Sequence, residues 1–318
     1  MNTVELIAII IGLAGTLFNV ILLWVIYRNR SIDRKCASIY KNIAVVDIFN
    51  CLIIPLCFLS LNESGYSIDL TSSKNTILYL LFGATVNIPY MLLILLSIAR
   101  VMIFRHQIFY SRIIQSVLVR ILCVLCWFLP IGGGLGIWFC FLLSGTATGN
   151  ILIYLLKVQG LVTFLLIITT LLLISVTLAL INQMISSNKG EFRPLLVTGQ
   201  SFMESSQVTE SKQILERELK SAQRTFSLFL LTILVFSLYP FAFSFSFLAC
   251  GPYYNSTESV CKPLQRKFFS EPKRSYAITL ISLCGMSLFN SLILLRQKSF
   301  LLTMKQIWIF RIKWRQIR

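Results

Sequence analysis

Charged residues are scarce in this chain. Asp, Glu, Lys and Arg make up 13% of its 318 residues, whereas an average soluble domain contains about 25%. Histidine occurs once, at position 106, and the sequence has no glycine-rich phosphate loop, dinucleotide loop or cluster of metal-ligating residues. The sequence therefore gives no indication of an enzyme, a cofactor or a metal site.

Hydrophobic residues make up 56% of the chain, and apolar runs of about 20 residues recur along it. A soluble core would interrupt such runs with polar faces, so we expect an all-α, multi-pass membrane protein. We expect residues 1–295 to form a bundle of seven spans, at residues 5–27, 42–61, 77–104, 117–143, 151–181, 225–250 and 276–295. Only residues 144–150 separate the fourth span from the fifth. If these two formed one span, six helices would remain and both termini would lie on the same side.

The basic residues predict the orientation of the bundle. With the amino terminus outside, the cytoplasmic segments and helix ends hold 22 of the 29 Lys and Arg residues, and the outer ones hold seven. The net charge of +17 is then mainly a property of the cytoplasmic face. It fits attraction to anionic lipid of the inner leaflet and does not require nucleic acid. We expect a plasma-membrane protein with an extracellular amino terminus and a cytoplasmic carboxyl terminus.

Two kinds of covalent modification are expected on the outer side. The sequons at Asn62 and Asn255 fall in predicted outer loops, which indicates N-glycosylation. Cys250 and Cys261 flank one outer loop in an oxidising compartment, and we expect a disulfide between them.

Two cytoplasmic segments are expected to be helical. Residues 296–318 mix aromatic and aliphatic residues with many Lys and Arg, so they are too charged to span and predict an amphipathic helix on the inner leaflet. Lys212, Glu216 and Lys220 follow i, i+4 spacing, which predicts that the sixth helix extends into the cytoplasm by several turns.

Polar side chains inside predicted spans are candidates for function because they are costly to place there. Four stand out, namely Asn19, Asp47, Arg100 and Asn290. At a rise of about 1.5 Å per residue, the two asparagines and the aspartate all lie about 8–12 Å from the cytoplasmic edge. They belong to the first, second and seventh spans, which become neighbours if the bundle closes in a ring. We therefore expect a shared polar network, and the alternative is three separately satisfied groups.

These residues stand in motifs whose order and placement resemble those of rhodopsin-like (class A) G-protein-coupled receptors. The matching segments are Gly15–Asn19 in the first span, Asn42–Asp47 with Pro55 in the second, Ser97–Val101 in the third, Trp127 in the fourth, Pro240 in the sixth, and Ser287 with Asn290 in the seventh. The similarity covers about residues 12–300.

The resemblance implies a receptor that binds an extracellular ligand and activates a heterotrimeric G protein when the sixth helix moves outward. It implies an intramembrane polar network made of Asn19, Asp47, Ser287 and Asn290. It also implies a hinge at Pro240 and a contact between Arg100 and the G protein in the opened cleft. The alternative for Arg100 is a snorkelling side chain whose head is drawn to the interface.

The chain departs from the family's pattern at several positions. Ala99 and Val101 replace the acidic residue and the tyrosine beside Arg100, so the usual local ion pair cannot form and the arginine is expected to be restrained less. Leu238 occupies the usual toggle-tryptophan position of the sixth helix, and Pro89 stands where a serine commonly completes a sodium site. This pattern suits a fast-diverging receptor, such as a nematode-type chemoreceptor.

The ligand pocket is expected between the outer halves of the third, fifth, sixth and seventh spans. Its candidate residues are Tyr79, Phe82, Lys157, Phe243, Phe247 and Tyr276. They favour a small and fairly apolar extracellular ligand, and Lys157 could bind an anionic group or snorkel outward. Two other functions stay open from the sequence: a polytopic transporter or channel, and a decayed receptor that folds without signalling.

Overall fold

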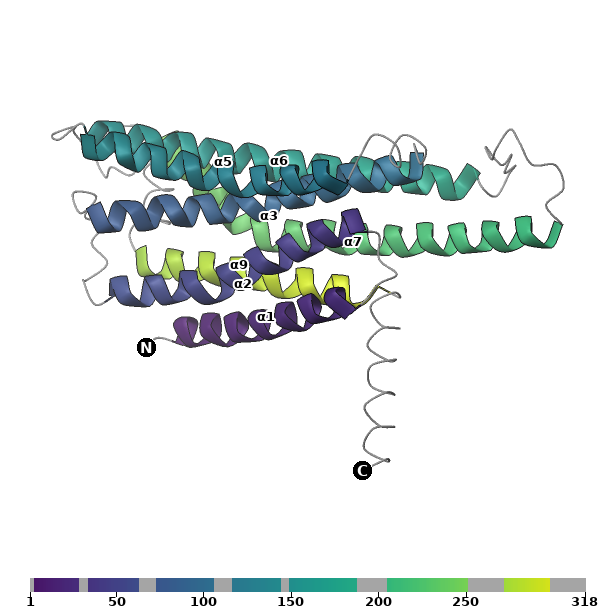
Figure 1. Ribbon diagram of the computed structural model, residues 1–318. Coiled ribbons are helices and arrows are strands. Elements are labelled where there is room, and N and C mark those ends of the chain that lie inside the picture. The colour runs from purple at the N-terminus through teal and green to yellow at the C-terminus, as the bar shows by residue number, and fades with distance from the viewer. Residues whose placement is uncertain are drawn as a thin grey trace, which may run out of the picture.

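The structure is a computed structural model of the chain, and it describes residues 3–28, 34–62, 73–105, 116–143, 149–187, 205–250 and 272–297. All regular secondary structure within these residues is helical, and the long helices lie side by side (Figure 1). The helices are α1 (Thr3–Arg28), α2 (Arg34–Asn62), α3 (Ser73–Arg105), α5 (Ser116–Leu143), α6 (Gly149–Ser187), α7 (Ser205–Cys250) and α9 (Pro272–Leu295).

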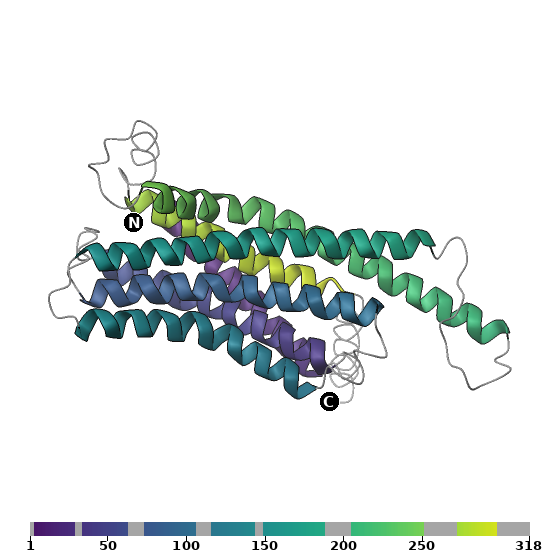
Figure 2. The ribbon, with the colours of Figure 1, turned by 90° about the horizontal axis from the view of Figure 1, so that it is seen from above.

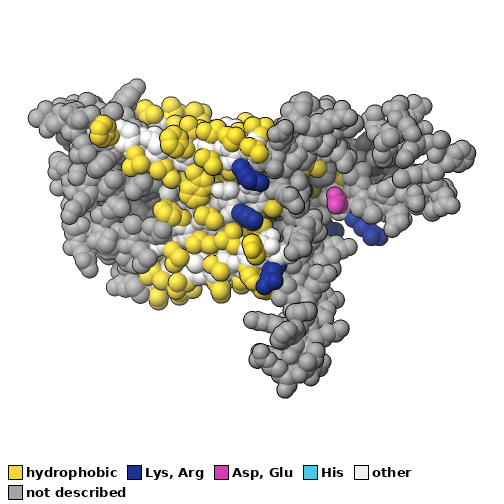
Figure 3. All heavy atoms as spheres, in the orientation of Figure 1, with side chains coloured by type: hydrophobic (Ala, Val, Ile, Leu, Met, Phe, Trp, Pro, Cys, Tyr) yellow, Lys and Arg dark blue, Asp and Glu magenta, His cyan; other side chains and the backbone are white. Residues whose placement is uncertain are grey.

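Six of these helices are long and apolar enough to cross a membrane. Their apolar stretches are Leu6–Arg28, Thr85–Ile103, Val117–Gly136, Gly160–Ser186, Glu216–Leu238 and Ile278–Leu295. In α2 the described side chains end at residue 52, so its apolar stretch is too short to be counted. Hydrophobic side chains cover much of the described part of the visible face of the bundle (Figure 3). Many large apolar side chains are exposed, and Phe128 is 68% exposed. An apolar surface of this extent needs lipid around it, so the protein is a multi-pass membrane protein.

The fourth and fifth predicted spans form two separate helices. α5 ends at Leu143 and α6 begins at Gly149, so the alternative in which they make one span is wrong. The two helices do not lie directly against each other over most of their length, because α3 packs between them (Figure 2). This position lets Thr163 of α6 donate a hydrogen bond to Asn87 Oδ1 of α3 at 2.8 Å.

Helix α7 is much longer than the predicted sixth span. It begins at Ser205, and its first part projects beyond the end of the bundle (Figure 1). Lys220 Nζ lies 2.6 Å from Glu216 Oε1 one turn earlier, on the exposed face of this part. The helical extension expected from the i, i+4 spacing is therefore confirmed.

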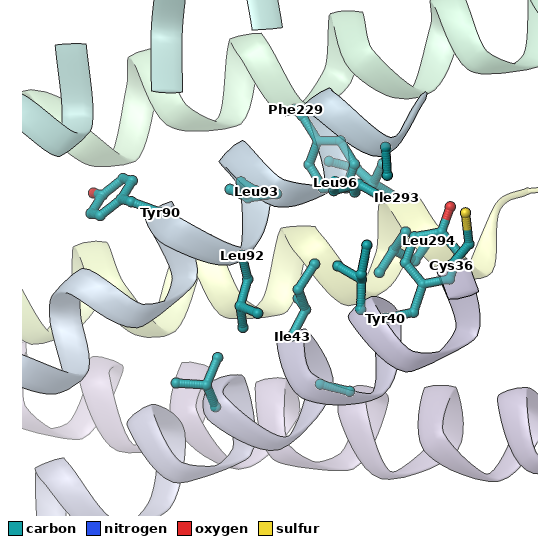
Figure 4. Close-up of a cluster of buried hydrophobic side chains, with 14 of the residues drawn as sticks. Cys36, Tyr40, Ile43, Tyr90, Leu92, Leu93, Leu96, Phe229, Ile293 and Leu294 are labelled. Carbon is teal, nitrogen blue, oxygen red and sulfur yellow. The ribbon is translucent and has the colours of Figure 1, made fainter. Parts of the chain in front are cut away.

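The helices close into a ring in which α1, α2 and α9 are neighbours. α1 packs against both α2 and α9, α2 also packs against α9, and α7 packs against α6 and α9. A single hydrophobic cluster runs through the bundle, and its members on α2, α3, α7 and α9 point toward one another (Figure 4). The three helices that carry the expected polar network are therefore neighbours.

Several predictions fall outside the described residues. The loop with Asn255 and Cys261 and most of the expected interfacial helix, 298–318, are among them. Asn62 and Cys250 are the last residues of α2 and α7, and their side chains are also outside the described part. The two glycosylation sites, the outer disulfide and the carboxyl-terminal helix therefore stay predictions.

Candidate functional site

Asp47 lies at the centre of the buried polar side chains, on the face of α2 that meets α9. Its carboxylate is fully buried. Ser287 Oγ donates to Asp47 Oδ1 at 2.9 Å, and Asn290 Nδ2 donates to Asp47 Oδ2 at 3.4 Å. Each carboxylate oxygen thus has a partner on α9. These bonds tie α2 to α9 in a region where no bulk water can replace them.

Asn19 connects the same cluster to α1. Its side-chain nitrogen donates to the carbonyl oxygen of Gly15 at 2.9 Å and to that of Ser287 at 3.3 Å. The structure therefore brings together the side chains that were expected to converge, from helices α1, α2 and α9. Ser287 links Asn19 to Asp47, because its carbonyl oxygen accepts from Asn19 and its hydroxyl group donates to Asp47.

Three amide oxygens around this network accept no hydrogen bond within the described part of the chain. They are Oδ1 of Asn19, Asn290 and Asn50, and all three residues are buried. Asn50 was not expected from the sequence. It lies three residues after Asp47, on the same face of α2, and that helical spacing was the signal that could have pointed to it.

Glycines allow α1 to come close enough to complete the network. A Cβ atom on Gly12 would lie 2.8 Å from the carbonyl oxygen of Cys51, and one on Gly15 would lie 2.7 Å from Cys51 Sγ. Any larger side chain would push α1 away from α2. This close approach of backbones through small residues is a common way for helices to associate in membranes.

Arg100 forms a contact that was not expected from the sequence. Its guanidinium group donates a hydrogen bond to the hydroxyl of Tyr40 on α2, and its central carbon lies 6.0 Å from the centre of that ring. Ala99 beside it is buried and offers no charge, and the carboxylate of Glu218 on α7 attracts Arg100 electrostatically. A buried tyrosine therefore contacts Arg100 where the family's motif has an acidic neighbour. The weaker restraint expected for Arg100 stays a prediction.

A hydrogen bond between side chains also fixes α5 to α2. Trp127 Nε1 donates to Asn42 Oδ1 at 3.0 Å, and Asn42 Nδ2 donates to the carbonyl oxygen of Ser38 at 2.8 Å. The tryptophan and the asparagine were both part of the motifs that carried the resemblance. Their contact helps to orient the first part of α2, which presents Tyr40 to Arg100.

Pro240 lies inside α7 and is buried. A proline within a helix removes one backbone hydrogen bond, here the one that the carbonyl group of Phe236 would accept, and so weakens the helix locally. Leu238, at the position of the usual toggle tryptophan, is 65% exposed on the outside of the bundle. Its side chain therefore points away from the space between the helices.

The six expected pocket residues lie on α3, α6, α7 and α9, but their side chains are outside the described part. Tyr79 and Phe82 are near the start of α3, and Lys157 is near the start of α6. Phe243 and Phe247 are near the end of α7, and Tyr276 is near the start of α9. The ligand pocket stays a prediction.

None of the cysteines whose side chains are described is in a disulfide, and all of them are buried. They are Cys36, Cys51, Cys123, Cys126 and Cys284. Among the described residues no group of three His, Cys, Asp or Glu side chains is arranged to hold a metal ion.

The chain matches no protein-family model, and comparison with curated proteins finds no match. Any function therefore has to be argued from the residues and their geometry.

Proposed function

We propose that this protein is a rhodopsin-like receptor that binds an extracellular ligand and activates a heterotrimeric G protein. The observation that carries the proposal is the buried network in which Asp47 accepts hydrogen bonds from Ser287 and Asn290 while Asn19 binds the backbone of Ser287. These residues come from the motifs that resemble those of the receptor family. Their contact supports the view that the motifs work together, since chance matches to separate motifs would not meet in one place.

In this proposal all seven helices cross the membrane, with the amino terminus outside. The distribution of basic residues supports this orientation. Arg28 ends α1, Lys41 and Arg120 lie near the starts of α2 and α5, and Arg296 follows α9; all four are exposed. Lys and Arg side chains line one edge of the hydrophobic surface (Figure 3), which becomes the cytoplasmic edge by the positive-inside rule.

The opposite end of the bundle is the ligand-binding side of the proposed receptor. The helix ends that carry the six pocket residues meet there, and their aromatic side chains suit a small, fairly apolar molecule. The Cys250–Cys261 disulfide and the glycans on Asn62 and Asn255 belong to the same outer side. The carboxyl-terminal segment 296–318 lies on the inner leaflet as an amphipathic helix.

Coupling to the G protein takes place at the inner end of α3. In the resting state the guanidinium group of Arg100 is held by Tyr40. When α7 moves outward, a cleft opens beside α3, and Arg100 turns into it to meet the G protein. A ligand drives this change only to the extent that it binds the open state more tightly than the resting state.

The proposal is tested by measuring basal G-protein activation in cells that express the full-length chain at graded surface levels. Basal activation does not require the ligand to be known. We expect activation of at least one G-protein class to rise with surface level, and Arg100→Ala to remove this rise at equal surface level. Arg120→Ala is the matched control, because Arg120 is an exposed arginine at the same end of the bundle. Equal signalling by wild type and Arg100→Ala would contradict the role given to Arg100.

A further inference from the structure

A second buried hydrogen bond lies away from the polar network and joins α3 to α7. The hydroxyl groups of Tyr90 and Ser237 are 2.8 Å apart, and both residues are buried. Figure 4 shows Tyr90 at one end of the hydrophobic cluster and Tyr40 at the other end. The contact is thus separate from the site around Arg100.

This hydrogen bond connects two helices whose backbones pack mainly on other partners. In the described part of the bundle α3 packs closely on α2, α5 and α6, whereas α7 packs closely on α6 and α9. The long side chain of Tyr90 bridges the space to α7. Since both residues are buried, separating their hydroxyl groups leaves two buried polar groups without this partner.

The contact lies next to the turn of α7 that Pro240 weakens. Ser237 is three residues before Pro240, and the proline removes the backbone hydrogen bond to the carbonyl group of Phe236. A change in the side-chain contacts of this turn can therefore bend α7 more easily than a change elsewhere along the helix.

Two aromatic contacts hold the same turn of α7 on its other sides. The ring of Phe241 stacks on Phe164 of α6 with a centroid distance of 4.6 Å. The ring of Phe236 lies 5.2 Å from that of Phe289 on α9, and a Cβ atom on Gly285 would come within 2.3 Å of it. These contacts are apolar and can slide, whereas the Tyr90–Ser237 hydrogen bond is directional and is either formed or broken.

We propose that the Tyr90–Ser237 hydrogen bond is the latch that keeps α7 against α3 in the resting protein. Breaking it lets the inner part of α7 swing outward about Pro240. A side chain at position 238 cannot restrain α7 in this way, because Leu238 points away from α3. The Tyr90–Ser237 hydrogen bond restrains α7 instead. The signalling consequence of this inference rests on the proposed receptor function. Its consequence for the position of α7 does not.

The signalling test uses Tyr90→Phe, which preserves the aromatic ring, and Ser237→Ala, which is compatible with the helical backbone of α7. Each removes one hydroxyl group, so we expect basal G-protein activation to rise about two- to tenfold at equal surface level. The double variant should rise no further than the stronger single variant, because both changes break the same bond. Ser237→Thr keeps a hydroxyl group and should stay near wild type, and Leu238→Ala should leave basal activation unchanged.

The conformational test needs no G protein. Spin labels carried by unnatural amino acids at Lys41 and Arg217, two exposed positions on α2 and α7, report the distance between the inner ends of these helices. We expect Ser237→Ala and Tyr90→Phe to enlarge the population with a long distance, and Ser237→Thr and Leu238→Ala to match wild type.

The two tests separate the two proposals. A longer distance in Ser237→Ala and Tyr90→Phe, with no G-protein activation by wild type or any variant, would support the latch and contradict the receptor function. An unchanged distance distribution in Ser237→Ala would overturn the latch, even if the wild-type protein signals. If Tyr90→Phe does not reach the surface, the comparison of Ser237→Ala with Ser237→Thr tests the latch in the same way.

Discussion

At the residue scale, Tyr40 determines the environment of Arg100. The guanidinium group donates to its hydroxyl and lies over its ring, and the tyrosine is buried in the hydrophobic cluster. The neighbouring Ala99 supplies no charge. In the proposed receptor, a tyrosine on a different helix therefore takes the place of the acidic neighbour in the motif that the sequence resembles. Such a restraint acts between α2 and α3, so it depends on how these helices pack.

Tyr40→Phe is expected to free Arg100 while keeping the packing of the ring. The loss of one hydrogen bond to a charged group should raise basal G-protein activation by about threefold or more. Tyr27→Phe is the matched control, because Tyr27 is 79% exposed on α1 and its hydroxyl group faces outward. Basal activation is measured for both variants at matched surface level. An effect of equal size in the control would show that the Tyr40 hydroxyl has no special role.

The sequence pointed to some of these residues and missed others for a physical reason. Asn19, Asp47 and Asn290 could be found because an amide or a carboxylate is rare inside an apolar span. Tyr40 and Ser237 could not, since a tyrosine near the inner end of a span looks like an ordinary interfacial aromatic residue, and a serine is cheap to bury in a helix. Which partner each one meets depends on the rotation of its helix, which hydrophobicity alone does not determine.

At the element scale, the position of α1 against α2 controls whether Asn19 reaches the network. The two helices approach closely because Gly12 and Gly15 have no side chain to separate them. At Gly12 the obstacle to a larger residue is a backbone carbonyl, which cannot rotate out of the way as a side chain can. The position of the whole helix is therefore sensitive to a single methyl group.

Gly12→Ala should therefore destabilise the bundle although alanine favours helices. The added Cβ atom would lie 2.8 Å from the carbonyl oxygen of Cys51, and overpacking of this kind costs about 1–3 kcal/mol. The measurement is thermal unfolding in detergent with a thiol-reactive dye, which reports the exposure of buried cysteines such as Cys51 and Cys284. Gly133→Ala is the control, because a Cβ atom there meets nothing within 4 Å. Equal melting temperatures for both variants would contradict the close contact.

The helices themselves were largely predictable, and their ends were less so. Long apolar runs predicted the separate helices in the described part of the chain, and the charge spacing around Glu216 predicted that α7 continues past the membrane. α6 extends to Ser187 and α7 begins at Ser205, well outside the expected spans. Hydrophobicity marks where a helix leaves lipid, but hydrogen bonds within the helix let it continue into water.

At the scale of the whole molecule, the charge distribution predicts how the bundle sits in the membrane. The exposed basic residues that follow α1 and α9 and precede the apolar parts of α2 and α5 lie at one end of the bundle. The positive-inside rule predicts that this end faces the cytoplasm. In the proposed receptor, the expected pocket, glycosylation sites and disulfide would then face the outside, and Arg100 would lie at the end that meets the G protein.

Epitope tags at the two termini test this orientation. We expect an amino-terminal tag to bind antibody on intact cells and a carboxyl-terminal tag to bind only after the membrane is permeabilised. Treatment with a glycosidase should lower the apparent mass of the wild-type protein on a gel. The apparent mass of the Asn62→Gln, Asn255→Gln double variant should not change. Antibody binding to both tags on intact cells would indicate an even number of spans and would contradict the seven-span topology.

The most direct measurement is nucleotide exchange by purified heterotrimeric G proteins in the presence of the purified protein in lipid nanodiscs. The account predicts that the wild-type protein accelerates exchange on at least one G-protein class, that Tyr90→Phe accelerates it further, and that Arg100→Ala does not accelerate it. If neither wild type nor Tyr90→Phe accelerates exchange on any class, although both are folded by their thermal unfolding, the proposed receptor function is contradicted.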